Sequence, residues 1–219
     1  MIVDCGREEL LSILNKRLKM WGFSCGGGIK DDAVFEESLS RSEKCFSFSR
    51  NKRFTIDGKV KYSINHSVQT AILYYYISNT AYKYGNTLIA DSVYYLNKIM
   101  HSVDWFYEIE LPIVFGAEHP VGSVLGRAEY GNKLFVHQNT TVGSSVNKLP
   151  RIGENVVLCA NSAVLGNCNV GNNVIISAGT IVINLDVPDN TIVFMDGSFH
   201  TLCEEKIKEK ISILTDFSE

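Results

Sequence analysis

A period of six residues in the second half of the chain limits its possible folds more than any other feature. One aliphatic position recurs every six residues without a slip, at Ile152, Leu158, Val164, Val170, Ile176 and Val182. A period this short leaves room for one short strand and one turn in each repeat. The aliphatic side chains then stack in columns as coils pile up about 4.8 Å apart, and sandwich strands with irregular turn spacing do not fit the pattern. The repeat predicts a mainly β fold, a left-handed parallel β-helix over residues 104–197.

The repeat is interrupted once. Tyr130, Val136 and Val142 continue the same phase upstream, but ten residues separate Val142 from Ile152. Four residues are therefore inserted between Ser144 and Arg151, and we expect a loop there.

Residues 1–103 do not show the six-residue period, and they predict a mainly helical N-terminal domain. Apolar positions at helical spacing predict helices over Glu8–Trp21, which Asp4 could cap, and over 67–82 and 87–101. Asp57-Gly58 between two short runs is typical of a hairpin. The face of the last helix comprises Ile89, Val93, Leu96 and Met100, and the cluster Tyr74, Tyr75 and Tyr76 is expected in the core.

Residues 198–219 predict a C-terminal helix. Its apolar stripe consists of Cys203, Ile207, Ile211 and Leu214, between charged residues. Such a stripe needs a partner, either the β-helix or a neighbouring subunit.

Composition excludes several classes of protein. The chain is 45% hydrophobic and 21% charged with a net charge of −3, which disfavours nucleic acid as the main partner. No apolar run reaches the roughly 20 residues that span a bilayer, and the N-terminus lacks a signal-peptide core, so a cytoplasmic protein without a membrane partner is expected. The six cysteines form no C-x-x-C pair, which indicates reduced thiols rather than a zinc or redox motif.

Two segments carry a resemblance to a known family. Residues 118–126, Glu-His-Pro-Val-Gly-Ser-Val-Leu-Gly, and residues 138–143, Gln-Asn-Thr-Thr-Val-Gly, resemble the catalytic coils of serine O-acetyltransferases, which are hexapeptide-repeat acyltransferases. The resemblance covers roughly residues 104–197. It implies acetyl-CoA as co-substrate, a small hydroxyl-bearing acceptor, and a homo-oligomer that is a trimer or a dimer of trimers. Asp104 lies fifteen residues before His119, where the family has its catalytic aspartate.

Acetyl transfer from a thioester to a hydroxyl needs a base beside that hydroxyl, and a histidine with a pKa near neutrality suits the task. His119 is the candidate base, and the alternative is a surface residue at a coil corner. A carboxylate on its other ring nitrogen would fix the tautomer and stabilise the imidazolium. Asp104 is the first candidate for that role, with Glu118 or Glu110 in reserve. Backbone amides near Gly143 are candidate oxyanion donors.

Further positions are candidates for ligand binding. By the resemblance, coenzyme A lies along the groove between adjacent subunits, where Gly143, Ala160 and Ala178 are the expected contacts. Substrate-binding candidates are Glu118, His137, Lys148 and Arg151. His137 follows His119 by eighteen residues, so we expect the two to stack on successive coils, facing outward. The pair could also bind a metal, but a third histidine at comparable phase is missing, so no metal site is predicted.

Two departures from the family concern the substrates. The family's Arg-His-Pro-Lys-Ile loop is Lys148-Leu149-Pro150-Arg151-Ile152 here, so Leu149 replaces its second histidine. The segment that covers coenzyme A in the family is replaced by Phe194-Met195-Asp196-Gly197. The sequence therefore predicts an acetyl-CoA-dependent O-acetyltransferase acting on serine or a sugar. An N-acetyltransferase for an amino-sugar and a non-catalytic β-helix used for assembly or binding are the alternatives.

Overall fold

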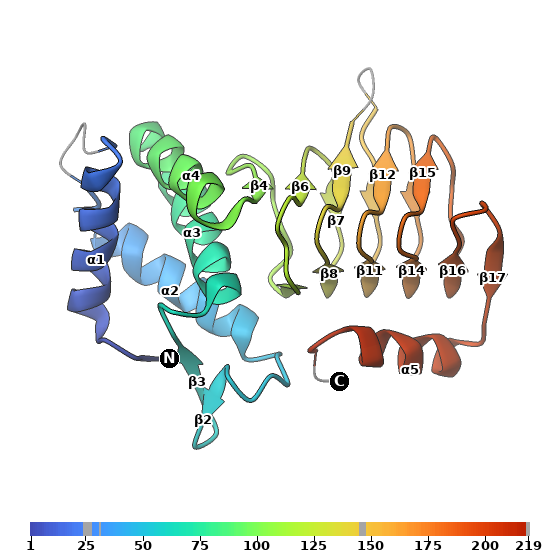
Figure 1. The fold of residues 1–219 in the computed structure, drawn as a ribbon, viewed down its shortest axis with the longest axis horizontal. Helices are drawn as coiled ribbons and strands as arrows, with labels where there is room; N and C mark the ends of the chain where they lie inside the picture. The colour runs from blue at the N-terminus through green and yellow to red at the C-terminus, as the bar shows by residue number, and fades with distance from the viewer. Residues whose placement is uncertain (24–27, 31, 145–147, 218–219) are drawn as a thin grey trace. The chain divides into compact units, whose positions relative to one another are not determined.

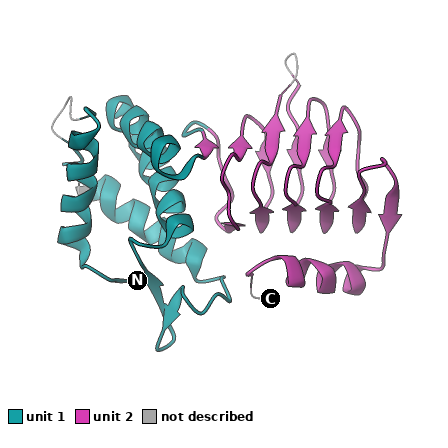
Figure 2. Cartoon of the chain, in the orientation of Figure 1, with its two compact units in different colours: residues 1–102, 106–108 teal, residues 103–105, 109–219 magenta. Residues whose placement is uncertain are grey.

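The chain forms two compact units in the computed structural model, which describes residues 1–23, 28–30, 32–144 and 148–217. Unit 1 comprises Met1–Ser102 and Phe106–Glu108, and unit 2 comprises Val103–Trp105 and Ile109–Glu219 (Figure 2). Each unit has its own core, so each is described separately.

Unit 1 is mainly helical. Its elements are β1 (Ile2–Val3), α1 (Arg7–Met20), α2 (Asp32–Phe46), β2 (Thr55–Ile56), β3 (Lys59–Tyr62), α3 (Ser67–Lys83) and α4 (Thr87–His101) (Figure 1). The helices predicted over 8–21, 67–82 and 87–101 are confirmed as α1, α3 and α4. The prediction that Asp4 caps α1 is wrong, because Gly6 is the N-cap and the Asp4 carboxylate lies 3.3 Å from Lys61 Nζ.

Helix α2 was not expected from the sequence. Its buried face carries serines as well as apolar residues, and these interrupt the apolar period. Ser38 Oγ donates to the Val34 carbonyl at 2.6 Å and Ser42 Oγ to the Ser38 carbonyl at 2.8 Å. Because each hydroxyl is satisfied by the preceding turn, both serines can be buried without an unpaired polar atom.

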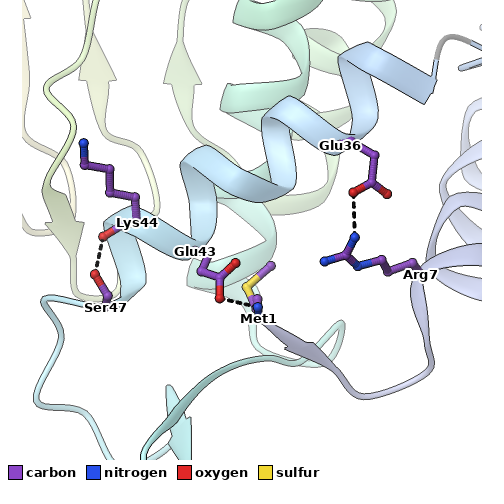
Figure 3. A network of polar contacts seen from close by, with 6 residues as sticks. All are labelled: Met1, Arg7, Glu36, Glu43, Lys44 and Ser47. Atoms are coloured by element: carbon purple, nitrogen blue, oxygen red, sulfur yellow. Dashed lines mark hydrogen bonds and ion pairs between the residues drawn. The ribbon is translucent and has the colours of Figure 1, made fainter.

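Two ion pairs connect the start of the chain to α2 (Figure 3). The Met1 amine pairs with Glu43, and Arg7 Nη1 lies 2.6 Å from Glu36 Oε2. The side chains of Arg7 and Glu36 are about half exposed, so this pair contributes little, at most about 1 kcal/mol.

The core of unit 1 lies between α3 and its neighbours. Tyr74, Tyr75 and Tyr76 are all buried, as predicted. On the predicted face of α4, Ile89, Val93 and Leu96 are buried, while Met100 is 38% exposed and its Sδ accepts from the Tyr74 hydroxyl at 3.8 Å. The helix end at which Met100 lies has less cover than its centre.

The hairpin predicted around Asp57-Gly58 is confirmed. Strands β2 and β3 pair antiparallel, with Ile56 opposite Lys59, so Asp57 and Gly58 form a two-residue loop. Both have positive φ, 50° and 72°, as such tight hairpin turns require.

Unit 2 is the predicted left-handed parallel β-helix, followed by one helix. Its strands are β4 (Asp104–Trp105), β5 (Phe115–Ala117), β6 (Val124–Leu125), β7 (Glu129–Tyr130), β8 (Leu134–Val136), β9 (Thr141–Gly143), β10 (Arg151–Ile152), β11 (Val156–Leu158), β12 (Ala163–Leu165), β13 (Asn169–Val170), β14 (Val174–Ile176), β15 (Ile181–Ile183), β16 (Thr191–Val193) and β17 (Phe199–Thr201). They form three sheets, ordered β13-β10-β7, β17-β16-β14-β11-β8-β5 and β15-β12-β9-β6-β4. All pairs are parallel except β16 with β17.

The strand register confirms the inserted loop. Arg151 pairs with Asn169, eighteen residues later, which is three repeats of six. One coil earlier, Glu129 pairs with Arg151, twenty-two residues later. The four additional residues fall between β9 and β10, within the stretch predicted from the sequence. Of that stretch, residues 145–147 lie outside the described residues.

Asparagines at the corners stabilise the stack of coils. Asn139 Nδ2 donates to Asn161 Oδ1 at 3.1 Å, and Asn155 Nδ2 donates to Asn173 Oδ1 at 2.9 Å. All four have positive φ, which asparagine tolerates better than most residues. The side chains therefore link successive coils at the points where the backbone turns.

Helix α5 (Glu204–Leu214) covers one face of the β-helix (Figure 1). It packs against β11, with Ile207 and Ile211 buried, so the β-helix is the partner of the predicted stripe. Cys203 is exposed and Leu214 half-buried, which limits the stripe to its central part.

Free thiols are found at Cys5, Cys45, Cys159, Cys168 and Cys203, while Cys25 lies outside the described residues. None of the helices described is both long and apolar enough to cross a membrane.

Candidate active site

His119 lies on a turn between β5 and β6, and its side chain is exposed. Its φ is 48°, a left-handed conformation that few non-glycine residues adopt. Two short hydrogen bonds hold the turn: Val121 N donates to the His119 carbonyl at 2.7 Å and Ser123 N to the Pro120 carbonyl at 3.0 Å. The backbone therefore fixes the direction in which the imidazole leaves the coil.

The His119 turn is longer than the corner directly beside it. Ala117 pairs with Val136, which places Glu118 beside His137. Val124 pairs with Thr141, which places Gly122 beside Asn139. Three residues separate Glu118 from Gly122, but one separates His137 from Asn139, so the His119 turn has two additional residues.

This register corrects the expectation that His119 and His137 stack on successive coils. The additional residues displace the phase at this corner, so Glu118 is the neighbour of His137, and its amide donates to the Val136 carbonyl at 3.0 Å. Counting sixes along the sequence misses the shift, because the offset between paired residues is nineteen before the turn and seventeen after it, and a regular count of eighteen shows neither value.

His137 is half-buried against the outer face of its sheet. Its ring packs edge-on against Phe135, with centroids 5.4 Å apart, and its Nε2 is buried with no hydrogen-bond partner among the described residues. Burial lowers the pKa of His137, the Glu118 carboxylate and the Leu214 backbone oppose the shift, and His119 adds to it. His137 is therefore neutral at pH 7, beside a carboxylate and a second histidine.

Asp104 lies on β4, paired with Val124 at the end of the His119 turn. Its amide donates to the Ser123 carbonyl at 2.8 Å, and the neighbouring Trp105 Nε1 donates to Ser123 Oγ at 2.9 Å. The Asp104 side chain is half-buried. Asp104 and His119 are thus brought to the same end of the β-helix by Ser123, which anchors both the strand and the turn.

The three positions expected to contact coenzyme A lie at two different corners of the β-helix. Ala160 and Ala178 follow β11 and β14, at the edge where Gln138 follows β8 and His119 follows β5. Both alanines are accessible and carry no bulk, so a thin ligand could approach the backbone there. Gly143 is the last residue of β9, so it lies at the next corner, at the other end of the strands β4, β6, β9, β12 and β15.

Lys148 and Arg151 lie at a different corner from His119, between β9 and β10. Arg151 Nε lies 2.9 Å from Glu129 Oε2, and Nη2 donates to Oε1 at 3.1 Å. The side chains of Arg151 and Glu129 are about two-thirds exposed. Lys148 and Leu149 are exposed as well. Within one copy of the chain these residues and His119 therefore face different sides of the β-helix.

Cys159 also belongs to this region, although the sequence did not identify it as a site residue. Extending the register, Cys159 lies beside His137 on the next coil, with its amide donating to Ile176. Burial raises the pKa of its thiol to about 11, so Cys159 is a neutral thiol at pH 7 and not a nucleophile. The four-residue insertion predicted from the sequence could have placed it, because it lengthens the eighteen-residue coil to the twenty-two residues that separate His137 from Cys159. The described residues contain no cluster of three or more histidine, cysteine, aspartate or glutamate side chains able to hold a metal.

No family model matches the chain. In sequence it is similar to the serine acetyltransferase of Synechococcus elongatus, 38% identical over 86 residues, 36% of this chain and 35% of that protein. The serine acetyltransferase of Staphylococcus xylosus is 24% identical over 176 residues, 77% of this chain and 74% of that protein. The chain thus matches about a third of the first relative's length and about three quarters of the second's.

Two solved structures that share the fold are serine acetyltransferases. The crystal structure of the Neisseria gonorrhoeae enzyme superposes with a TM-score of 0.64 and 20% identity, over 91% of this chain and 83% of that one. The complex of the Neisseria enzyme with serine gives a TM-score of 0.63 and 23% identity, over 84% and 81%. The chain therefore resembles serine acetyltransferases in sequence and shares their fold.

Proposed function

We propose that the chain is an acetyl-CoA-dependent O-acetyltransferase, with serine as the leading candidate for the acceptor and His119 as general base. The observation that carries the proposal is the His119 turn, a lengthened corner that directs an exposed histidine away from the coil beside Glu118 and His137. The similarity to serine acetyltransferases supports the choice of acceptor.

In this reaction His119 accepts the proton of the acceptor hydroxyl as its oxygen attacks the thioester carbonyl. The C–S bond then breaks, and the departing thiolate takes the proton back from the imidazolium. A positioned histidine supplies about 10²–10⁴-fold to such a step. Asp104, held at the same end of the β-helix, orients the imidazole and stabilises its charged form.

Acetyl-CoA would lie along the edge that carries Ala160 and Ala178, since those side chains leave the backbone accessible. Gly143, Lys148 and Arg151 are at other edges of the same copy, so one copy alone does not gather all the expected ligand contacts. A second copy would have to bring them to His119.

We infer a homotrimer from the outer face of the sheet formed by β4, β6, β9, β12 and β15. Val124, Ile181 and Ile183 are 36%, 62% and 55% exposed on or beside this face. Such exposed aliphatic residues mark a face that another protein surface covers. Identical copies arranged about a threefold axis would bury this face and bring Lys148 and Arg151 of one copy to the His119 turn of the next.

The proposal is tested by thiol release from acetyl-CoA with serine, homoserine, several sugars and an amino-sugar as acceptors. We expect release with serine. Release with sugars alone would change the acceptor, release with the amino-sugar alone would indicate N-acetylation, and release with none would favour a β-helix without catalytic activity.

A further inference from the structure

The end of the chain returns to the face of the β-helix that carries His137. After α5, Phe217 is buried at 8% exposure, and its ring meets Phe135 edge-on, with centroids 5.5 Å apart at 88°. Phe135 in turn packs against the ring of His137 at 5.4 Å and 64°. A continuous series of three rings therefore runs from the C-terminal segment to His137.

Gly116 makes room for this series. A Cβ at Gly116 would lie 2.7 Å from Phe135 Cδ2 and 3.1 Å from Phe217 Cε1, so any larger side chain would displace the rings. Gly116 belongs to β5, the strand that leads directly into Glu118 and His119. The rings thus pack on the strand from which the His119 turn begins, as well as on His137.

His137 is held by the Phe135 ring and by the backbone of Leu214, which acts on the imidazole as a hydrogen-bond partner. Its buried Nε2 makes no hydrogen bond with a described residue, and a buried polar atom without a partner is rare enough to call for an explanation. The titratable groups on the surrounding elements include Glu118, His119, Cys159 on the next coil and Asp216 in the C-terminal segment, and helix α5 adds Glu205, Lys208 and Glu209, which line a pocket with Phe217. Glu118 and His119 are the two titratable neighbours whose electrostatic effect reaches the imidazole.

We propose that the C-terminal segment, residues 214–217, positions the His119 turn, and that it acts through Phe135 and His137. The role rests on the proposed acetyltransferase function. By covering His137, the segment keeps that imidazole out of water and in one place beside Glu118. His119 is then the one histidine at this corner that gains a charge during the reaction. A second cation, on His137, would disfavour the His119 imidazolium.

A double-mutant cycle tests whether the two residues act together. Phe217→Ala and His137→Asn should each lower kcat by about tenfold, since small displacements of a catalytic group have effects of this size or larger, with KM for acetyl-CoA unchanged. The double variant should lose no more than either single variant, because both remove the same support. Ile213→Ala, at a position of α5 that is 77% exposed, is the control and should keep the wild-type rate. Losses that multiply in the double variant, or an unchanged kcat in Phe217→Ala, would overturn the proposal.

A second measurement does not depend on catalysis. In the full-length protein, NMR titration of the His137 ring should show a higher pKa in Phe217→Ala than in wild type, because its cover is removed. If Phe217→Ala does not fold, Phe217→Leu keeps the apolar cover in part and should give a smaller rise. An unchanged His137 titration would overturn the proposal. Failure of wild type to release thiol would instead refute the acetyltransferase function, while the titration would still test the packing.

Discussion

Gly122 lies directly beside Asn139 on the next coil, with no space between them for a side chain. A Cβ at Gly122 would be 2.2 Å from Asn139 Oδ1, and φ at the two residues is 76° and 54°. Asn139 also donates to Asn161, so it cannot move without breaking that bond. The far end of the His119 turn is therefore fixed at a position where only glycine fits.

We expect Gly122→Ala to destabilise unit 2 by about 2–4 kcal/mol, since it adds a clash to the strain of a positive φ. It should also lower kcat, because the His119 turn must shift. Gly197→Ala is the matched control: its φ is also positive, 81°, but nothing lies within 4 Å of the added Cβ. Equal melting temperatures for the two variants would show that the close approach to Asn139 has no effect.

The proposed trimer predicts that Ile181→Glu yields monomers. The side chain is 62% exposed, so the charge does not disturb the core of one copy, but a charge in an apolar interface is costly. Size-exclusion chromatography with light scattering measures the outcome. Ile213→Glu, on α5 and 77% exposed, should leave the mass unchanged. An Ile181→Glu protein with the wild-type mass would place the interface elsewhere.

If Arg151 meets the phosphates or an acidic part of the substrates, Arg151→Gln should raise KM several-fold with little change in kcat. Glu129→Gln breaks the same ion pair but keeps the cation, so it separates ligand binding from the pair itself. Both should change the free energy of unfolding by less than about 1 kcal/mol, because the pair is exposed. Identical KM values in the two variants and wild type would remove Arg151 from the binding site.

Acid should destabilise unit 1 through His101. Burial and the nearby Arg17 lower the pKa of His101 to about 4, although its Nδ1 lies 2.7 Å from Asn97 Oδ1. Between pH 6.5 and 4 the unfolded state therefore binds more protons, and stability falls as the pH is lowered. By pH 5 the loss from this group is about 2 kcal/mol. Urea unfolding at pH 7.5 and pH 5 should show it, and His101→Gln should reduce the difference. The same dependence in both proteins would assign the effect to other groups.

The sequence predicted those parts of the fold in which one physical period dominates. The six aliphatic residues that recur every six positions from Ile152 to Val182 lie inside the β-helix, since a six-residue period allows no other regular stacking. Helix α2 was missed because Ser38 and Ser42 occupy its buried face, and their hydroxyls are satisfied only once the helix exists.

The candidate site was less accessible to sequence reasoning. The resemblance singled out His119, but a count of repeats paired it with His137, whereas strand pairing places Glu118 there. Two additional residues in one turn change the offset between paired residues from nineteen to seventeen, and a regular count of eighteen reveals neither value. The contact of Phe217 with Phe135, eighty-two residues apart, follows from the path of α5 and from no local pattern.

The role of His119 is the central claim, and His119→Ala tests it most directly. Thiol release from acetyl-CoA with serine should fall about 10²–10⁴-fold in kcat, with the melting temperature unchanged because the side chain is exposed. His200→Ala, an exposed histidine on β17, should keep the wild-type rate. Acetyl transfer by His119→Ala at the wild-type rate would contradict the account.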